Sequence, residues 1–454
     1  MENHVFFSLT ISSFLLLYGV LRVSDSIWWK PKLLEKHLKR QGIKGTPYKL
    51  LVGDMKEFVW QITQAWSKPL DLAHQIFPRV DPFTHDIVQK YGKISLCWAG
   101  KTPRLIVKDP ELMKEVLSNK LGHFGKPPLN PLILILTRGL TSLEGEDWAR
   151  HRRIINPAFN IEKSKGMIPI FGTSCANMIK QWSESFGNED TCEIDAWPEF
   201  QKLTGDIISR TAFGSSFEEG KRVLELQKEL QVLVVEAMQT LYIPGFRYIP
   251  TKKNRRRKEL DKSITLMLRT MIERREKEII TGKSVSDDLL GMLIQSNNQS
   301  KTQEKASGAR TGGMTVEQII EECKLFYLAG HETTSSWLTW TVIILAIHQD
   351  WQEKARQEVL QICRGQNLDF EVINHLKITT MVLYEVLRLY PPVIAHYQHT
   401  YKETKIGDIS IPEGVDVTLP TLLIHHDPEL WGDDAEEFRP RGSLKVFQKH
   451  PKTS

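Results

Sequence analysis

Cysteine is scarce in this chain of 454 residues, which contains only five. They lie far apart, at positions 97, 175, 192, 323 and 363. Small secreted proteins that depend on disulfides carry dense and usually even sets of cysteines. The sparse, odd number therefore argues against a disulfide framework and favours a reducing compartment for the main body of the chain.

An excess of charge of one sign is also lacking. The chain has 60 lysines and arginines against 55 aspartates and glutamates, a net charge of +5. This mild excess gives no argument for nucleic acid, so we expect no nucleic-acid partner, but it suits a negatively charged membrane surface. With 41% apolar and 25% charged residues, the composition is that of a folded globular protein. It excludes a largely disordered chain, a collagen-like fibre and a multi-span membrane protein.

The chain opens with a long uncharged apolar run. Residues 5–21 (VFFSLTISSFLLLYGVL) carry no charge, and their length is at the short end of the roughly 17–25 residues that span a membrane. Basic residues follow between Arg22 and Arg40, which places the rest of the chain in the cytosol. A cleaved secretory signal is the alternative, but it requires a basic start and a small-residue cleavage site. The sequence predicts a single membrane anchor over 1–23 and a basic, Gly- and Pro-containing hinge over 24–54.

Alternating strands and helices are not found in the body of the chain, and most segments have helical periodicity. Short strands are predicted at 93–99, at 104–107 and within 405–418, where apolar and polar residues alternate. The polar, Gly- and Ser-containing stretch 297–313 predicts a surface loop. The expected fold class is mainly α with a small β-sheet subdomain, preceded by one transmembrane helix.

One predicted helix has an unusual middle. Thr315 and Gln318 form a capping box, and the helical pattern then continues without proline for about 30 residues, or roughly 45 Å. In its middle, Ala329-Gly330-His331-Glu332-Thr333-Thr334 combines small residues with an acid and hydroxyls. Two readings stay open. The small residues permit close helix packing, with hydroxyls bonded to the preceding turn, or they form a notch for a flat ligand beside groups that relay a proton.

A second constellation lies near residue 385. Glu385 and Arg388 are three residues apart and share a helix face, and the side chains around them are apolar. An exposed ion pair would be worth less than about 1 kcal/mol. The apolar flanks instead predict a partly buried pair with a structural rather than a catalytic role.

Four segments in this order resemble the cytochrome P-450 family: WARHR at 148–152, AGHETT at 329–334, YEVLR at 384–388 and HHDPELWGDDAEEFRP at 425–440. The resemblance covers nearly the whole chain, anchor and hinge included. ISRTAFGSSFEEG, at 208–220, is similar to the plant clan acting on terpenoids and hormones. The resemblance implies a cytochrome P-450-like helical domain over 55–440.

The resemblance implies a haem-dependent monooxygenase that inserts one oxygen atom from O2 into a small apolar, terpenoid- or hormone-like substrate. Its cofactor would be haem b, and a membrane-bound NADPH–cytochrome reductase would supply electrons. Within the central motif, Thr333 and Glu332 would deliver protons, while Ala329 and Gly330 would leave room for haem and O2. The implied location is the endoplasmic reticulum membrane, with the catalytic domain in the cytosol and membrane lipid around the anchor.

Other implied roles lie outside the central motif. Trp148 and Arg152 would contact a haem propionate, and His399 would partly replace a propionate-binding arginine that the family often has at the position of Gln398. Glu385 and Arg388 would hold the fold around the loop that carries the haem ligand.

The chain departs from the family after Pro440. The family's cysteine ligand stands in F-x-x-G-x-R-x-C-x-G, and residues 441–454 (RGSLKVFQKHPKTS) contain no cysteine. Cys363 lacks the surrounding motif, so no residue is assigned as a metal ligand. Read one nucleotide earlier, freely chosen codons for this tail permit E-R-F directly after Pro440, which predicts an aberrant, frame-shifted tail over 441–454. The alternatives are a membrane-anchored pseudoenzyme or remnant without haem, and a helical carrier of apolar ligands.

Overall fold

The computed structural model describes residues 2–118, 122–185, 191–214, 217–240, 242–283, 288–307, 312–364 and 369–441. The predicted tail over 441–454 thus lies almost wholly outside the described residues. The contacts within the chain define two compact units. The sheet unit comprises residues 1–128, 239–241 and 393–437, and the helical unit comprises residues 129–238, 242–392 and 438–454.

The sheet unit contains a six-stranded sheet of order β1-β2-β3-β8-β5-β4. Its strands are β1 Lys44–Gly45, β2 Ile94–Ala99, β3 Thr102–Val107, β4 Phe124–Gly125, β5 His396–Thr400 and β8 Asp416–Leu419. β2 and β3 form the antiparallel hairpin predicted at 93–99 and 104–107, which turns at Gly100 with a φ of 63°. β8 joins β3 in parallel and β5 in antiparallel register. The stretch 405–418 contributes β8 and also a separate hairpin, β6 Thr404–Ile406 and β7 Ile409–Ile411.

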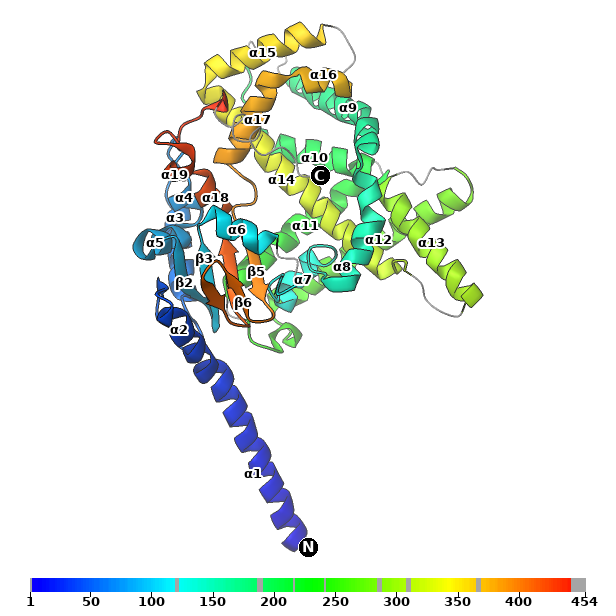
Figure 1. Cartoon of the computed structure of the whole chain (residues 1–454). Helices are drawn as coiled ribbons and strands as arrows, with labels where there is room; N and C mark the ends of the chain where they lie inside the picture. Colours follow the sequence, from blue (N-terminus) through cyan, green and yellow to red (C-terminus); the bar gives the residue numbers. More distant parts are fainter. Residues whose placement is uncertain are drawn as a thin grey trace. The chain divides into compact units, whose positions relative to one another are not determined.

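The N-terminal segment is helical for longer than predicted. α1 Glu2–Ser24 continues through η1 Asp25–Trp29 into α2 Lys30–Arg40 without a break (Figure 1). Residues 10–40 hold the one candidate membrane span found among the described residues, and the apolar window that defines it is 0% buried. The first part of the segment 24–54 is therefore helical up to Arg40, and Leu34 and Leu38 of α2 are buried. Only the residues after Arg40 are irregular, and β1 pairs there with β2.

Short helices complete the sheet unit. They are α3 Met55–Trp66, α4 Phe77–Val80, α5 Pro82–Tyr91, α6 Pro110–Leu117, α18 Thr421–His425 and α19 Pro428–Trp431. Side chains of Asp81 and Asp109 cap α5 and α6, and proline follows each cap, as is favoured at the first position of a helix.

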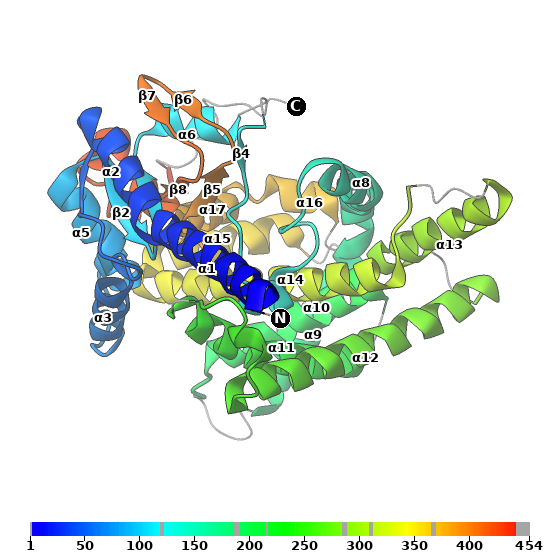
Figure 2. The ribbon, with the colours of Figure 1, turned by 90° about the horizontal axis from the view of Figure 1, so that it is seen from below.

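The helical unit contains both long and short helices. They are α7 Pro131–Thr137, α8 Gly145–Ile155, η2 Asn156–Phe159, α9 Ile161–Ser185, α10 Ala196–Phe213, α11 Phe217–Met238, η3 Phe246–Tyr248, α12 Lys252–Ile280, α13 Leu289–Ser307, α14 Val316–Ile347, α15 Gln349–Cys363, α16 Phe370–His375 and α17 Lys377–Leu389. α14 packs along α10 and also contacts α12, α13 and α17, while α12 contacts both α11 and α13 (Figure 2). The fold is mainly α with small sheets, as predicted.

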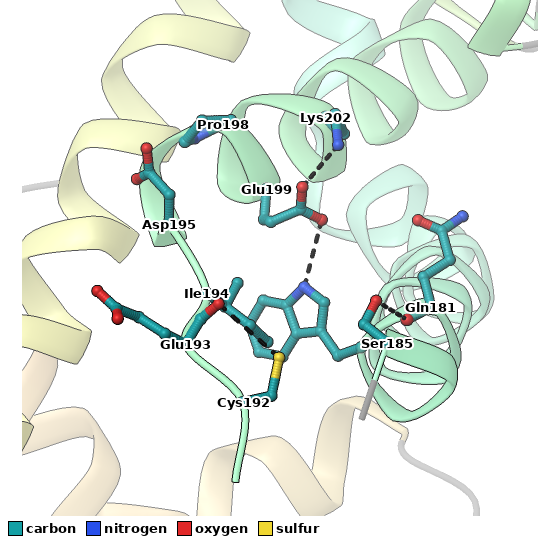
Figure 3. Close-up of a pocket in the computed structure, with 10 residues that line it drawn as sticks. Gln181, Ser185, Cys192, Glu193, Ile194, Asp195, Pro198, Glu199 and Lys202 are labelled. Carbon is teal, nitrogen blue, oxygen red and sulfur yellow. Dashed lines mark hydrogen bonds and ion pairs between the residues drawn. The ribbon is translucent and has the colours of Figure 1, made fainter. Parts of the chain in front are cut away.

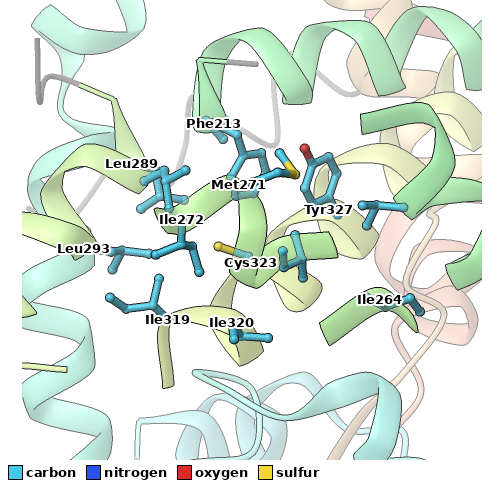
Figure 4. Close-up of a cluster of buried hydrophobic side chains, with 14 of the residues drawn as sticks. Phe213, Ile264, Met271, Ile272, Leu289, Leu293, Ile319, Ile320, Cys323 and Tyr327 are labelled. Atoms are coloured by element: carbon cyan, nitrogen blue, oxygen red, sulfur yellow. The ribbon is translucent and has the colours of Figure 1, made fainter. Parts of the chain in front are cut away.

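The core of the helical unit surrounds the first half of α14. Cys323 and Tyr327 of α14 lie among apolar side chains of α10, α12 and α13, including Leu293 (Figure 4). The rings of Phe213 and Tyr327 are stacked with centroids 4.1 Å apart. A helix whose first half is buried on this scale is held by packing rather than by its intrinsic propensity.

The surface loop predicted over 297–313 is wrong for residues 297–307, which belong to α13. Tertiary contacts override the polar composition there. Asn297 is buried and its amide donates to the carbonyl oxygen of Met314, and Ser300 is buried as well. Residues 308–311 lie outside the described part of the chain.

Candidate functional site

The central helix begins where the capping box predicts. Thr315 Oγ1 accepts the backbone N–H of Gln318, and the Gln318 side chain accepts the backbone N–H of Thr315. From this start, α14 runs for 32 residues, or about 48 Å. The local sequence therefore determines where α14 begins. The motif at residues 329–334 follows the last α14 residue of the buried core, Tyr327.

The small residues of α14 have two different environments. A Cβ atom added at Gly330 would lie 2.8 Å from Cδ1 of Ile208, a side chain of α10. Ala329 is exposed. The two readings of the motif therefore apply to different residues, since Gly330 permits close packing of α10 on α14, while Ala329 leaves an open face.

The hydroxyl of Thr333 lies on the same open face as Ala329, one turn further on. Thr333 Oγ1 donates to the backbone carbonyl of Ala329 at 2.7 Å. A hydroxyl has one donor and two acceptor lone pairs, so this bond uses the donor and leaves the lone pairs available.

The acid of the motif faces other helices. Burial raises the pKa of Glu332, opposed by the charge of Lys228 and a hydrogen bond from Gln231, both on α11. Its neighbour His331 has a lowered pKa, because burial disfavours the imidazolium more than its hydrogen bond to the Gln201 carbonyl favours it. The hydroxyl of Thr204 on α10 donates to the backbone carbonyl of His331 at 3.2 Å. The structure thus places Glu332 beside Thr333 in sequence but in a separate polar cluster.

The two predicted propionate contacts of the helical unit share one face of α8. Trp148 and Arg152 are four residues apart, and both are exposed. Within the described residues, neither side chain has a hydrogen bond or ion pair. An unpaired guanidinium next to an aromatic ring suits a carboxylate, which arginine binds through two parallel hydrogen bonds.

Sequence reasoning missed the buried partner of α8. His151 Nδ1 donates to Glu322 Oε1 at 2.6 Å, and the two residues are 1% and 0% exposed. Glu322 is on α14, two helical turns before Ala329. His151 stands within the WARHR motif and Glu322 within the predicted central helix, but 171 residues separate them along the chain, so no local pattern indicated their pairing.

Glu385 and Arg388 form the predicted pair on α17. Their side chains are 1% and 4% exposed, so an exposed ion pair is excluded and the burial is more complete than expected. Glu385 also accepts the backbone N–H of Arg439 at 2.8 Å. This pair therefore joins α17 to the last described segment of the chain.

His399 belongs to the sheet unit, whereas the other predicted site residues belong to the helical unit. Its Nδ1 atom is 2.7 Å from Oδ1 of Asp416 on the neighbouring strand β8. Asp416 is also 3.4 Å from Nη2 of Arg104, whose guanidinium lies over the ring of Tyr397. Sequence reasoning missed Arg104 and Asp416, although the alternation of the strands places them on the face of His399.

The predicted site residues do not line a separate pocket at the end of α9. This pocket, of about 350 Å³, lies between Trp182, the segment at Cys192 and the start of α10 (Figure 3). The indole of Trp182 and the ammonium of Lys202 both donate to Glu199, and the hydrogen bond from Lys202 lowers the pKa of that carboxyl. Its polar groups satisfy one another, so the pocket gives no argument for catalysis.

The described residues fit part of a haem. Arg152 and Trp148 suit its carboxylates, and the face of Ala329 lacks bulk. The two buried cysteines, Cys97 and Cys323, do not fit the iron. Burial raises the pKa of Cys97 to about 12 and also raises that of Cys323, so both thiols resist forming the thiolate that ligation requires. Among the described residues no cluster of three or more His, Cys, Asp or Glu could hold a metal ion.

Comparison with known proteins extends the resemblance to most of the chain. The sequence model of the family Cytochrome P450 matches residues 75–445. The protein Cytochrome P450 CYP72A616 of Paris polyphylla is 48% identical over 92% of this chain and 80% of its own length. Secologanin synthase 1 of Catharanthus roseus is 46% identical over 92% of this chain and 80% of its own length.

A solved structure agrees on the fold. The retinoic acid bound cyanobacterial CYP120A1 superposes with a TM-score of 0.67 over 88% of this chain and 81% of that one, at 20% sequence identity. This likeness shows the fold, while the family model over residues 75–445 and the long matches to plant relatives show the family. The chain belongs to the cytochrome P450 family of haem-dependent monooxygenases.

Proposed function

We propose that this protein uses the open face of α14, between Ala329 and Thr333, as the dioxygen side of a haem b site. One observation supports it above all. The core helix α14 exposes the small side chain of Ala329 and places the half-buried hydroxyl of Thr333 one turn further on along the same face. Close helix packing explains Gly330, and the bond of Thr333 to the preceding turn fits either reading, but close packing does not explain the exposed Ala329.

Haem supplies the redox chemistry and would transfer one oxygen atom from O2 to the substrate. Thr333 would accept a hydrogen bond from water or from a protonated group through its free lone pairs, while its own O–H stays donated to the carbonyl oxygen of Ala329. Glu332, with its raised pKa, is protonated over a wider pH range than an exposed carboxyl, which suits a proton donor. Thr333 and Glu332 would thus take part in proton transfer, and the backbone carbonyl of Ala329 would hold the Thr333 hydroxyl in place.

On α8, Arg152 and Trp148 would hold the haem through a propionate. Arg153 is exposed on the same helix, and this basic face would dock a membrane-bound NADPH–cytochrome reductase. Arg150 contributes less to such docking, because it pairs with Asp147 and donates to the Gly313 carbonyl.

The substrate we propose is a small apolar molecule of the terpenoid or hormone-like class, in keeping with relatives such as secologanin synthase. The N-terminal apolar helix would anchor the protein in the endoplasmic reticulum membrane, with the catalytic domain on the cytosolic side. The basic residues after Leu21 support that orientation.

The test begins with the transcript across the codons for Phe438–Ser454 and beyond, followed by expression of the protein it encodes. If the transcript encodes the family's cysteine motif after Pro440, we expect its protein to show a reduced carbon monoxide difference spectrum with the red-shifted band of thiolate-ligated haem. Alanine substitution of Cys97 or Cys323 should leave that band in place, since neither thiol ionises readily. A protein that folds but shows no haem band would overturn the proposal and identify a haem-free pseudoenzyme.

A further inference from the structure

A buried contact joins α8 to α14 and has no part in the proposed chemistry. His151 donates through Nδ1 to Oε1 of Glu322, and the second oxygen, Oε2, accepts the backbone N–H of Leu140 at 3.2 Å. His151 Nε2 is buried as well and has no hydrogen-bond partner in the described part of the chain. The imidazole is therefore held by Glu322 alone.

The loop before α8 is fitted to the same carboxylate. Gly139 has a φ of +106°, and a Cβ atom there would lie 2.9 Å from Glu322 Oε2. Only glycine combines this backbone conformation with so close an approach. Glu322 is thus the point at which α14, α8 and the loop at Gly139 meet.

The register of both helices relates this contact to the proposed haem site. Successive residues of a helix are about 100° apart around its axis, so Ala329 and Thr333, which follow Glu322 by seven and eleven residues, lie within about 20° of its direction. On α8, His151 directly precedes Arg152. The contact between His151 and Glu322 therefore places α8 on one face of α14, and Ala329 and Thr333 lie further along that same face.

A second contact follows the same face. Phe159 of η2, the turn that continues α8, stacks on Phe326 of α14 with ring centroids 5.5 Å apart. α8 and η2 thus contact this face of α14 at Glu322 and Phe326, and the first exposed position after them is Ala329.

A buried ion pair adds little stability over a well-packed apolar pair, but it can specify a register. We propose that His151 and Glu322 form a latch that fixes α8 on α14 and so determines where Trp148 and Arg152 stand relative to Ala329 and Thr333. The two are positioning residues. The latch follows from the contact between His151 and Glu322. Only its effect on haem binding rests on the proposed function.

Hydrogen–deuterium exchange of the full chain without haem tests the latch directly. His151→Leu should speed amide exchange in residues 139–155 by at least about tenfold, because buried Glu322 loses its partner. His151→Asn should restore much of the protection, since its amide N–H can occupy the place of Nδ1–H. Unchanged exchange in 139–155 for His151→Leu would overturn the latch.

A matched control lies two residues further along α14. Lys324 is also buried and pairs with Asp261 of α12 and Glu321 of its own helix. Lys324→Met should speed exchange in α12 and leave residues 139–155 unaffected. If it loosens 139–155 as much as His151→Leu does, the effect is general destabilisation and the latch is refuted.

Titration with ferric haem separates positioning from simple stability. The double variant His151→Leu/Glu322→Leu removes both members of the ion pair and also the acceptor of the Leu140 N–H, so its melting temperature should fall, but by less than that of His151→Leu, which leaves a buried charge. We expect the double variant to bind haem at least about tenfold more weakly than the unchanged protein, a factor that corresponds to 1.4 kcal/mol. Haem affinity equal to that of the unchanged protein, measured below both melting temperatures, would overturn the positioning role. If the unchanged protein binds no haem while exchange confirms the latch, the proposed function fails and the latch stands.

Discussion

The carboxylate of Glu385 holds Arg388 with both of its oxygens. Arg388 donates from Nε to Oε2 at 2.9 Å and from Nη2 to Oε1 at 2.7 Å. Such bidentate bonds between charged groups are stronger than single neutral ones. Because Oε1 also accepts the Arg439 backbone N–H, the pair fastens the segment after Phe438 to α17.

Arg388→Leu should destabilise the protein by about 3–5 kcal/mol, because it leaves the Glu385 charge buried without its partner. Arg388→Lys should cost less, since it keeps the charge but loses the two-point geometry. Urea unfolding followed by circular dichroism measures both. The exposed pair of Lys354 and Asp350 provides the control, because Lys354→Ala should change the free energy of unfolding by less than about 1 kcal/mol. Equal losses at the two sites would contradict the structural role of Arg388.

The contact between Gly330 and Ile208 gives a prediction in which two effects oppose each other. Gly330→Ala gains about 1 kcal/mol of helix propensity, but the new methyl group overlaps Ile208, and overpacking costs about 1–3 kcal/mol. We expect a net loss of stability of up to about 2 kcal/mol. Gly330→Val should lose more, since its two further methyl groups have no space.

A double-mutant cycle checks the origin of that loss. Ile208→Ala alone leaves a cavity, so it should be destabilising by itself. In the Ile208→Ala background, Gly330→Ala should become neutral or stabilising, since the overlapping atoms are gone and the propensity gain remains. Additive effects of the two substitutions would show that Gly330 and Ile208 do not touch in solution.

His331 predicts a dependence of stability on pH. Its pKa is lowered in the folded protein from the ordinary value of 6.5, so its contribution is present above pH 6.5 and is lost as the pH falls through the lowered pKa. Thermal unfolding measured on both sides of that value should show the loss. His331→Gln should reduce the loss on the acid side, because glutamine does not ionise. Identical pH profiles for the two proteins would refute the assignment.

The parts of the fold that could be predicted depend on local signals. The start of α14 is determined by a capping box of four consecutive residues, Thr315 to Gln318. The turn between β2 and β3 is made at Gly100. Strands β1 and β4 have two residues each and pair with distant partners, so no local pattern marks them. The polar residues of α13 predicted a loop because the buried contact of Asn297 with Met314 is invisible in its own segment.

The candidate site divides in the same way. Ala329 and Thr333 are one turn apart, so helical spacing alone predicts their common face. Helical spacing alone could not show that Gly330 has a packing role different from that of Ala329, since this role depends on Ile208 of another helix. The pairing of His151 with Glu322 depends on the approach of α8 to α14, which only the three-dimensional structure supplies.

Thr333 gives the prediction that reaches furthest into function. In the haem-containing protein, Thr333→Ala should lower the product formed per NADPH consumed by at least about tenfold, the scale of a lost proton-transfer group. Reductant would still be consumed, because haem and substrate binding do not need the hydroxyl. Thr333→Ser should restore coupling, since it keeps the oxygen.

The matched control for Thr333 is Thr339, whose hydroxyl makes the same kind of bond to the carbonyl four residues earlier, that of Ser335, at 2.8 Å. Thr339→Ala removes an equivalent helix contact without touching the open face, so coupling should be unchanged. Measuring product and NADPH together distinguishes uncoupling from slow turnover, which lowers both in proportion. If Thr333→Ala and Thr339→Ala are equally well coupled, the hydroxyl of Thr333 only stabilises its helix, and the proton path must use other groups on α14.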